Sequence, residues 1–195
     1  MDLQLKGKTA LVTGSTAGIG WAIACELAAE GAAVVINGRD AARVESAAQR
    51  LRAKVSGADV RGVAADLAAL PGCQRLIDAA ADVDLLINNL GIFDPRPFEA
   101  ISDSEWARFF EVNVMSGVRL ARHHLPRMKA RNWGRVVFIS SESGICPPGD
   151  MVHYGMTKSA QLSSSRGLAE TCAGTGVTVN AVLPRVEGGV VRALV

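Results

Sequence analysis

The stretch Thr13-Gly14-Ser15-Thr16-Ala17-Gly18-Ile19-Gly20 decides the fold, because it connects an apolar run to a segment with helical spacing. The apolar run, residues 9–12, is typical of a buried strand, and residues 21–28 continue as a helix. A strand, a glycine-rich turn and a helix in this order form a phosphate site, because backbone N–H groups and the helix dipole favour an anion there. The alternative is a tight strand–helix turn that binds no ligand.

The three glycines of this turn have separate tasks. Gly14 permits the tight bend, Gly18 lets a pyrophosphate approach the backbone, and Gly20 lets the helix sit close to the strand. Their spacing is G-x3-G-x-G, where the commoner pattern is G-x-G-x-x-G. The turn therefore predicts a dinucleotide site near the start of the chain.

The composition is that of a single globular domain over residues 1–195, with 49% apolar and 21% charged residues. A net charge of +2 without a basic run argues against a nucleic-acid partner. No apolar run has transmembrane length and the first residues form no signal peptide, so we expect no membrane partner and a cytoplasmic protein. The four cysteines are far apart, so we expect reduced thiols and no metal site.

Strand-like and helix-like segments alternate along the rest of the chain. This alternation predicts an α/β fold with a parallel, doubly wound sheet. We expect Asp40 and Asp103 to be the N-cap residues of two of the helices. The expected strands are residues 9–12, 34–37, 60–64, 83–88, 135–139 and 177–183, and the later helices are residues 40–55, 73–80, 104–131 and 153–173.

Polar, glycyl or prolyl residues follow each expected strand. In a parallel sheet, ligands bind outside the carboxyl ends of the strands. This row of residues therefore predicts one shared ligand crevice. It includes Arg39, Asp66, Asn88, Gly91, Ser141 and Pro184.

Tyr154 and Lys158 stand at positions i and i+4 of an expected helix, one turn apart on one face. A lysine ammonium beside a phenol favours the phenolate, so we expect the pKa of Tyr154 to fall towards neutral pH. Such a tyrosine can give or take a proton. The alternative is that the pair belongs to a solvated helix face.

Together these motifs resemble the short-chain dehydrogenase/reductase family. Their order and spacing fit from about Lys6 to Pro184, and within the family the chain is most similar to 3-oxoacyl-carrier-protein-reductase-like oxidoreductases. The resemblance implies a Rossmann-type sheet. The matching features are the glycine turn, Asn88-Asn89-Leu90-Gly91, Asn113, Ser141, Tyr154 and Lys158.

The resemblance implies four catalytic residues. Tyr154 would be the general acid for carbonyl reduction, or the base for alcohol oxidation. Lys158 would lower the pKa of Tyr154 and hold the nicotinamide ribose, and Ser141 would hydrogen-bond the substrate oxygen. Asn113 would position a water that links Lys158 to solvent, and its alternative is a packing amide between helix and strand.

The resemblance also implies the cofactor contacts. Asp66 would reach the adenine, and its alternative is a loop cap; Asn88 and Gly91 would line the cofactor. The full set is Gly14, Ser15, Gly18, Ile19, Gly20, Arg39, Asp66, Asn88, Gly91, Tyr154, Lys158 and Pro184.

The end of the second strand bears on the choice of cofactor. An acidic residue there would accept hydrogen bonds from the adenosine ribose and repel a 2′-phosphate, but this chain has Gly38 followed by Arg39. A guanidinium suits a phosphate, and Asn37 could add a polar contact. We therefore favour NADP(H) over NAD(H), although Ala17 stands where NADP-preferring relatives often carry a basic residue.

The chain departs from the family after Pro184, where Arg185 stands in place of a glycine. We expect no seventh strand and no substrate-covering loop, which leaves an unpaired sheet edge and apolar surface. Either the gene product is truncated or a segment is missing from the sequence. We also expect a homodimer or homotetramer, because Phe109, Phe110 and Met115 add apolar surface to the helices that pair in relatives.

Two functions follow from these residues. The first is an oxidoreductase that transfers a hydride between NADP(H) and a small ketone or secondary alcohol. The second is a non-catalytic dinucleotide-binding module without the C-terminal substrate region. Ser141, Tyr154 and Lys158 favour the first, because a binding module has no use for that set.

Overall fold

Seven strands form one sheet in the computed structural model, which describes residues 3–187 and 190–194. The strand order is β3-β2-β1-β4-β5-β6-β7, and all neighbours are parallel except β6 and β7. This order is that of a doubly wound sheet, which confirms the predicted fold class. The strands are β1 (Thr9–Val12), β2 (Ala33–Gly38), β3 (Val60–Ala64), β4 (Leu85–Asn88), β5 (Gly134–Ile139), β6 (Val177–Glu187) and β7 (Val190–Leu194).

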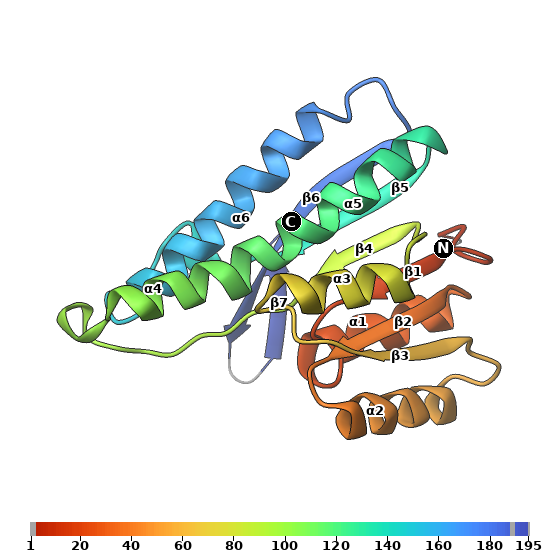
Figure 1. The fold of residues 1–195 in the computed structure, drawn as a ribbon, viewed down its shortest axis with the longest axis horizontal. Coiled ribbons are helices and arrows are strands. Elements are labelled where there is room, and N and C mark those ends of the chain that lie inside the picture. The colour runs from red at the N-terminus through yellow and green to blue at the C-terminus, as the bar shows by residue number, and fades with distance from the viewer. Residues whose placement is uncertain (1–2, 188–189, 195) are drawn as a thin grey trace.

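Helices cover both faces of the sheet, and each face has its own hydrophobic core. Figure 1 places α2 along β2 and β3 at one end of the sheet, and α5 and α6 at the other. One core joins the sheet to α1 and α2, and the second joins it to α3, α5 and α6. The helices are α1 (Gly18–Ala29), α2 (Ala41–Lys54), α3 (Leu70–Ala79), α4 (Asp103–Phe110), α5 (Ser116–Ala130) and α6 (Val152–Glu170).

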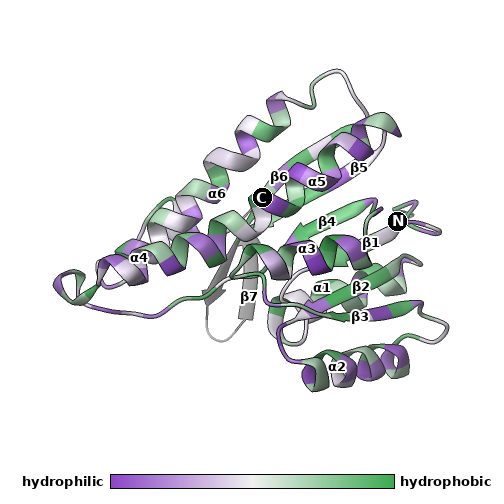
Figure 2. Cartoon of the chain, in the orientation of Figure 1, coloured by the Kyte–Doolittle hydropathy of each residue, from purple (hydrophilic) through white to green (hydrophobic). Residues whose placement is uncertain are grey.

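Hydropathy explains which elements are central. Figure 2 shows β4 as almost wholly hydrophobic, whereas α2 alternates between the two colours. All four residues of β4 are buried, as a strand covered on both faces requires. The buried residues of α2 are Val44, Ala47, Ala48 and Leu51, so one side of this helix faces the sheet.

The helix starts confirm one predicted cap and correct another. The Asp40 carboxylate accepts a hydrogen bond from the Arg43 N–H at 2.8 Å, so Asp40 is the N-cap of α2 as predicted. The second prediction, Asp103, is wrong. Ser102 caps α4, and a capping box joins it to Glu105. Glu105 reaches back to the Ser102 N–H because it lies three residues on.

The long helix predicted over residues 104–131 is not one regular helix. A π-helical segment, η2 (Glu111–Met115), separates α4 from α5. The Ser116 N–H bonds to the carbonyl of Glu111, five residues back, and the Ser116 hydroxyl bonds to the Val112 carbonyl at 2.6 Å. Two short 3₁₀ turns, η1 (Phe98–Ala100) and η3 (Glu142–Gly144), lie in the loops before α4 and α6.

The parallel part of the sheet ends at β6, and a short strand that was not expected, β7, follows it. β7 pairs antiparallel with the end of β6, with Leu183 opposite Leu194 and Glu187 opposite Val190. β6 extends beyond the parallel part of the sheet, and the pairing satisfies backbone groups of that extension. From Val177 to Val182 the pairing of β6 is with β5, and β7 does not reach this part of its edge.

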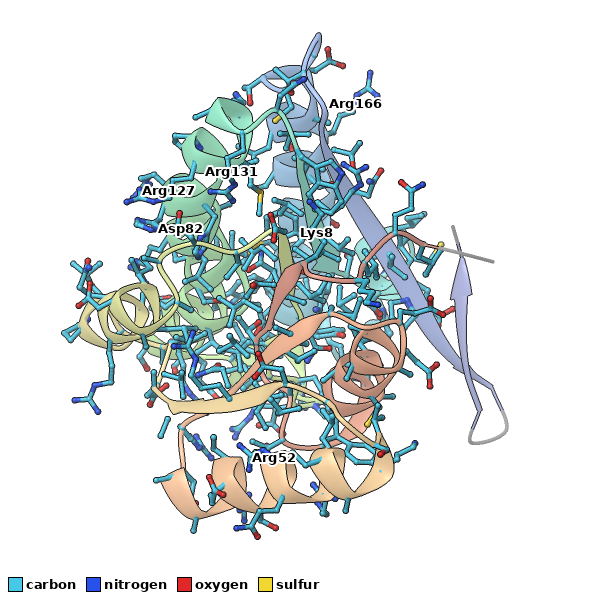
Figure 3. All side chains as sticks on the ribbon, turned by 90° about the vertical axis from the view of Figure 1, so that its right-hand side faces the viewer. Lys8, Arg52, Asp82, Arg127, Arg131 and Arg166 are labelled. Atoms are coloured by element: carbon cyan, nitrogen blue, oxygen red, sulfur yellow. The ribbon has the colours of Figure 1, made fainter. Side chains whose placement is uncertain are left out.

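Ion pairs at the amino ends of the parallel strands connect the loop before β4 to α5. Asp82, just before β4, lies 3.4 Å from Arg127 and 3.2 Å from Arg131 of α5 and its C-cap (Figure 3). These groups are solvent-exposed, so each pair contributes little to stability, about 0–1 kcal/mol. No helix in the described part of the chain is both long and apolar enough to cross a membrane.

Candidate active site

The glycine turn has the backbone geometry of an anion cradle. Gly14 and Gly18 have φ angles of +60° and +58°, where a residue with a side chain is disfavoured. A Cβ on Gly20 would lie 2.4 Å from the Asn89 side chain and 2.6 Å from the Gly14 carbonyl, whereas the space beside Gly18 is open. No side chain caps the N-terminus of α1. The turn therefore fits the pyrophosphate of a dinucleotide.

Side chains around the turn hold it in place. Ser15 accepts a hydrogen bond from the Asn37 N–H at 3.0 Å and donates to the Val12 carbonyl at 2.6 Å. Its own N–H donates to the Asn37 carbonyl. Ser15 is fully buried and engaged within the protein, so in this structure it supports the turn. Ile19, by contrast, lines the catalytic cavity described below.

A cavity of about 390 Å³ extends from the turn along the ends of β2 and β3. Gly38 lies beside Thr16, with 2.6 Å from a Cβ at Gly38 to the Thr16 methyl group, and no acidic side chain stands at this position. Arg39 and Arg43, both exposed, line the cavity with Asp66. Two guanidinium groups beside the ribose end of such a cavity suit a phosphate.

Asn37 and Asp66, which were predicted to contact the cofactor, form hydrogen bonds to other groups of the protein. The Asn37 amide donates to the carbonyls of Val63 and Ala65 at 3.2 and 3.1 Å, so it ties β2 to the end of β3. Asp66 accepts from the Ala68 N–H at 3.1 Å, which is the loop cap given as the alternative interpretation, and Asp66 also lines the cavity, where its predicted contact with adenine stays a prediction.

Of the two asparagines at the end of β4, Asn89 contacts the glycine turn, whereas Asn88 was predicted to line the cofactor site. Asn88 is 3% exposed, packs against Gly117 and lines neither cavity. Asn89, which was not among the predicted site residues, donates to the carbonyls of Thr13 and Gly14 at 2.9 and 3.1 Å. Successive strand residues point to opposite sides, so only one asparagine of the pair reaches the glycine turn.

A second cavity, of about 350 Å³, brings the other predicted residues together. Ser141, the N-cap of η3, accepts from the Ser143 N–H at 3.1 Å. Lys158 Nζ lies 5.5 Å from the centre of the Tyr154 ring. Gly91 lines both cavities, so they meet there. Ile19, Gly91, Ser141, Tyr154, Lys158 and Pro184 all line the second cavity.

The electrostatics correct the predicted state of Tyr154. Burial raises the pKa of Tyr154, and a hydrogen bond with Ser141 opposes this rise. Burial, rather than the Lys158 ammonium, sets the direction of this shift. The ammonium lies 5.5 Å from the centre of the Tyr154 ring and donates to the Ile139 carbonyl at 2.9 Å and to Gln161 Oε1 at 3.2 Å. Burial also lowers the pKa of Lys158 to about 8.

The Asn113 side chain acts as the packing amide that was the alternative interpretation. It accepts from the Ile92 N–H at 2.8 Å and donates to the Ile92 carbonyl and to Thr157 Oγ1, each at 3.0 Å. It thereby joins η2 to the loop after β4 and to α6. Its backbone carbonyl accepts from Gln161 Nε2 at 2.6 Å, a contact that was not predicted. Its predicted role in positioning a water stays a prediction.

The sheet is doubly wound and carries a glycine turn after β1, and Ser141, Tyr154 and Lys158 line the adjacent cavity. This combination defines a dinucleotide-dependent oxidoreductase fold of the short-chain type. The chain belongs to the short-chain dehydrogenase family, whose model matches residues 8–190. This match confirms the predicted family, and together with the relatives below it confirms that the chain belongs to a family of enzymes.

The chain is similar in sequence and in structure to several oxidoreductases. The chain is 54% identical to the uncharacterized oxidoreductase YvaG of Bacillus subtilis, covering 94% of this chain and 70% of that one. It is 34% identical to the 3-oxoacyl-acyl-carrier-protein reductase FabG of Aquifex aeolicus, covering 94% and 75%. The L-sorbose reductase of Gluconobacter frateurii, solved with NADPH and L-sorbose, superposes with a TM-score of 0.88 at 34% identity over 93% of this chain and 70% of that one.

Proposed function

We propose that this protein transfers a hydride between NADP(H) and a ketone or secondary alcohol. The observation that carries the proposal is that two cavities meet at Gly91: one begins at the glycine turn, and the other holds Ser141, Tyr154 and Lys158. An extended dinucleotide bound across Gly91 would place its phosphates at the turn and its other end beside Tyr154.

The preference for NADP(H) rests on the residues at the end of β2. Arg39 and Arg43 line the cavity there, and Gly38 occupies the position where an acidic residue would repel a 2′-phosphate. The nearby Asp40 carboxylate is held by the Arg43 N–H as the cap of α2. The sorbose reductase with bound NADPH supports the same preference.

The mechanism of carbonyl reduction follows from three side chains. Bound NADPH supplies the hydride. Ser141 donates a hydrogen bond to the substrate oxygen, where negative charge develops. Tyr154 gives its proton to that oxygen, and its raised pKa keeps it protonated at neutral pH, as an acid must be. Lys158, with a pKa of about 8, is mostly cationic at neutral pH and stabilises the phenolate that forms.

The proposal includes a homodimer or homotetramer that pairs through α4, η2 and α6. Phe110 is 39% exposed and suits such an interface. Phe109 does not, because it is buried against His153 with 4.0 Å between ring centres. Light scattering tests this part of the proposal. A measurement that shows only monomer at micromolar concentration would contradict it.

The test of the activity is a panel of ketones and secondary alcohols, assayed with NADPH or NADP⁺ and separately with NADH or NAD⁺. We expect turnover of at least one substrate, with the phosphorylated cofactor preferred. Tight NADPH binding without turnover of any substrate would favour the dinucleotide-binding module instead.

A further inference from the structure

Gln161 is a buried polar side chain of α6 that is bonded at both ends. It is 2% exposed and lies one helical turn after Lys158. Its Oε1 accepts from Lys158 Nζ at 3.2 Å, and its Nε2 donates to the backbone carbonyl of Asn113 at 2.6 Å. A buried amide with both ends bonded is fixed in one orientation.

The π-helical segment η2 presents the Asn113 carbonyl to α6. Its wider turn pairs the Ser116 N–H with the Glu111 carbonyl, and the Ser116 hydroxyl donates to the Val112 carbonyl. Side chains thus serve as partners for two carbonyls of this segment, Ser116 for one and Gln161 for the other. π-helical turns within α-helices are frequent at functional sites. The irregular helix and the glutamine therefore form one structural unit.

This unit acts on the charge and the direction of Lys158. Lys158 is 4% exposed, and burial opposes the charge of its ammonium. Two oxygen acceptors, the Ile139 carbonyl and Gln161 Oε1, favour the charged form and fix where Nζ points. An ammonium has three N–H donors, so one remains for a ligand or for Tyr154.

Other ionisable groups near Lys158 are few in the described part of the chain. Tyr154 and Glu142 line the same cavity. On the elements that pack against α6, Glu105 pairs with Arg96, Glu111 pairs with Arg119, and Arg135 donates to the carbonyls of Gly134 and Gly176. Asp103 and Arg108 of α4 do not line the cavity that holds Lys158. His153 packs against Phe109 and Trp106. A change at Gln161 is therefore expected to act mainly on Lys158.

We propose that Gln161 is a positioning residue of this active site, whose amide links the Lys158 ammonium to the Asn113 carbonyl and holds Lys158 charged and aimed at Tyr154 and the cofactor. The proposal rests on the proposed function for the role of Lys158. The family resemblance assigns a link between Asn113 and Lys158 to a water, and Gln161 provides a direct link between them.

Two substitutions of similar size test the proposal by opposite shifts. Gln161→Met removes the acceptor, so the loss of activity and of NADPH affinity at alkaline pH should move to lower pH by about one unit. Gln161→Glu places a carboxylate beside the ammonium, so this loss, the alkaline limb of the pH profile, should move to higher pH. The measurements are kcat/KM for one accepted carbonyl and the dissociation constant of NADPH, each as a function of pH. Ser165→Ala, a buried change further along α6, should leave the limb unmoved.

Several results would overturn the proposal. One is that the alkaline limb of the pH profile stays in place in both variants although thermal unfolding shows that both are destabilised. That outcome is expected if Gln161 has a purely structural role. If Gln161→Met fails to fold, Gln161→Glu decides alone: a limb at higher pH supports the proposal, and an unmoved or lower one overturns it. A protein that reduces no carbonyl but shows opposite shifts in NADPH binding supports this inference and overturns the proposed activity.

Discussion

The glycine turn and the catalytic centre around Lys158 are built in different ways. The turn lies within eight consecutive residues, and its shape follows from positive φ angles and close backbone packing. The centre around Lys158 is assembled from β5, η2, η3 and α6, whose residues lie far apart in the sequence. Local steric requirements can be read from a sequence, whereas a network of side chains from four elements cannot.

The largest effect is expected at the assembled centre. Lys158→Ala removes the ammonium that stabilises the Tyr154 phenolate and holds the cofactor ribose. We expect turnover to fall by about 10²–10⁴-fold and NADPH affinity by about tenfold. Steady-state kinetics and fluorescence titration measure the two effects. A loss of affinity alone, with turnover retained at saturating NADPH, would assign Lys158 to binding only.

The glycine turn should respond through sterics. In Gly20→Ala the new methyl group would meet the Asn89 amide and the Gly14 carbonyl, so the backbone must shift. We expect the free energy of unfolding to drop by about 1–3 kcal/mol, with weaker NADPH binding. Denaturant unfolding checks the drop. Gly167→Ala is the control, because nothing lies within 4 Å of a Cβ there; equal losses in both variants would contradict the steric account.

The cofactor preference provides a third test of the turn region. Arg39→Ala should weaken NADPH binding by about 1–3 kcal/mol, the value of a charge-assisted contact, and leave NADH binding unchanged. Arg166→Ala, in an exposed ion pair on α6, should change neither. Equal affinities of the unmutated protein for NADPH and NADH would sink the assignment of Arg39.

The smallest effect concerns a local feature away from both regions. Ser102→Ala removes the capping box of α4 and should destabilise the protein by about 1 kcal/mol, with activity nearly unchanged. Thermal unfolding measures it, and the exposed Ser163→Ala of α6 serves as the control. A loss no larger than in that control would show that Glu105 or Asp103 supports the helix start without the hydroxyl.

Much of the fold could be predicted, because strand and helix alternate with clear apolar patterns. The errors have local physical reasons. The sequence does carry a capping-box signal at Ser102 and Glu105, but Asp103 is also a good cap on composition alone. The π-helical segment leaves the apolar pattern unbroken, so no periodicity reveals it. The seventh strand depends on pairing with an extension of β6 that family resemblance does not describe.

The site residues that belong to a sequence motif were predicted. Those whose side-chain direction is set by neighbouring residues in the fold were missed. The sequence placed Ser141, Tyr154 and Lys158 in one cavity, and the structure brings them together there. It did not distinguish Asn88 from Asn89, because the direction of each side chain depends on the strand register.

Two further errors concern polar partners. The predicted fall in the pKa of Tyr154 took account of Lys158 but not of burial, which raises this pKa, while the ammonium bonds to Gln161 and Ile139. Gln161 itself gives no signal beyond its place on the same helix face as Lys158. The partners of a buried side chain are set by tertiary packing, which neither spacing nor composition reports.

The central claim is that the two regions form one site, in which Tyr154 delivers the proton to a substrate held beside a bound dinucleotide. The most direct test compares Tyr154→Phe with the unmutated protein in turnover of an accepted ketone and in NADPH titration. This change removes only the hydroxyl, so we expect turnover to fall by at least about 10²-fold while the NADPH dissociation constant stays within about threefold. Retained turnover in Tyr154→Phe would contradict the account.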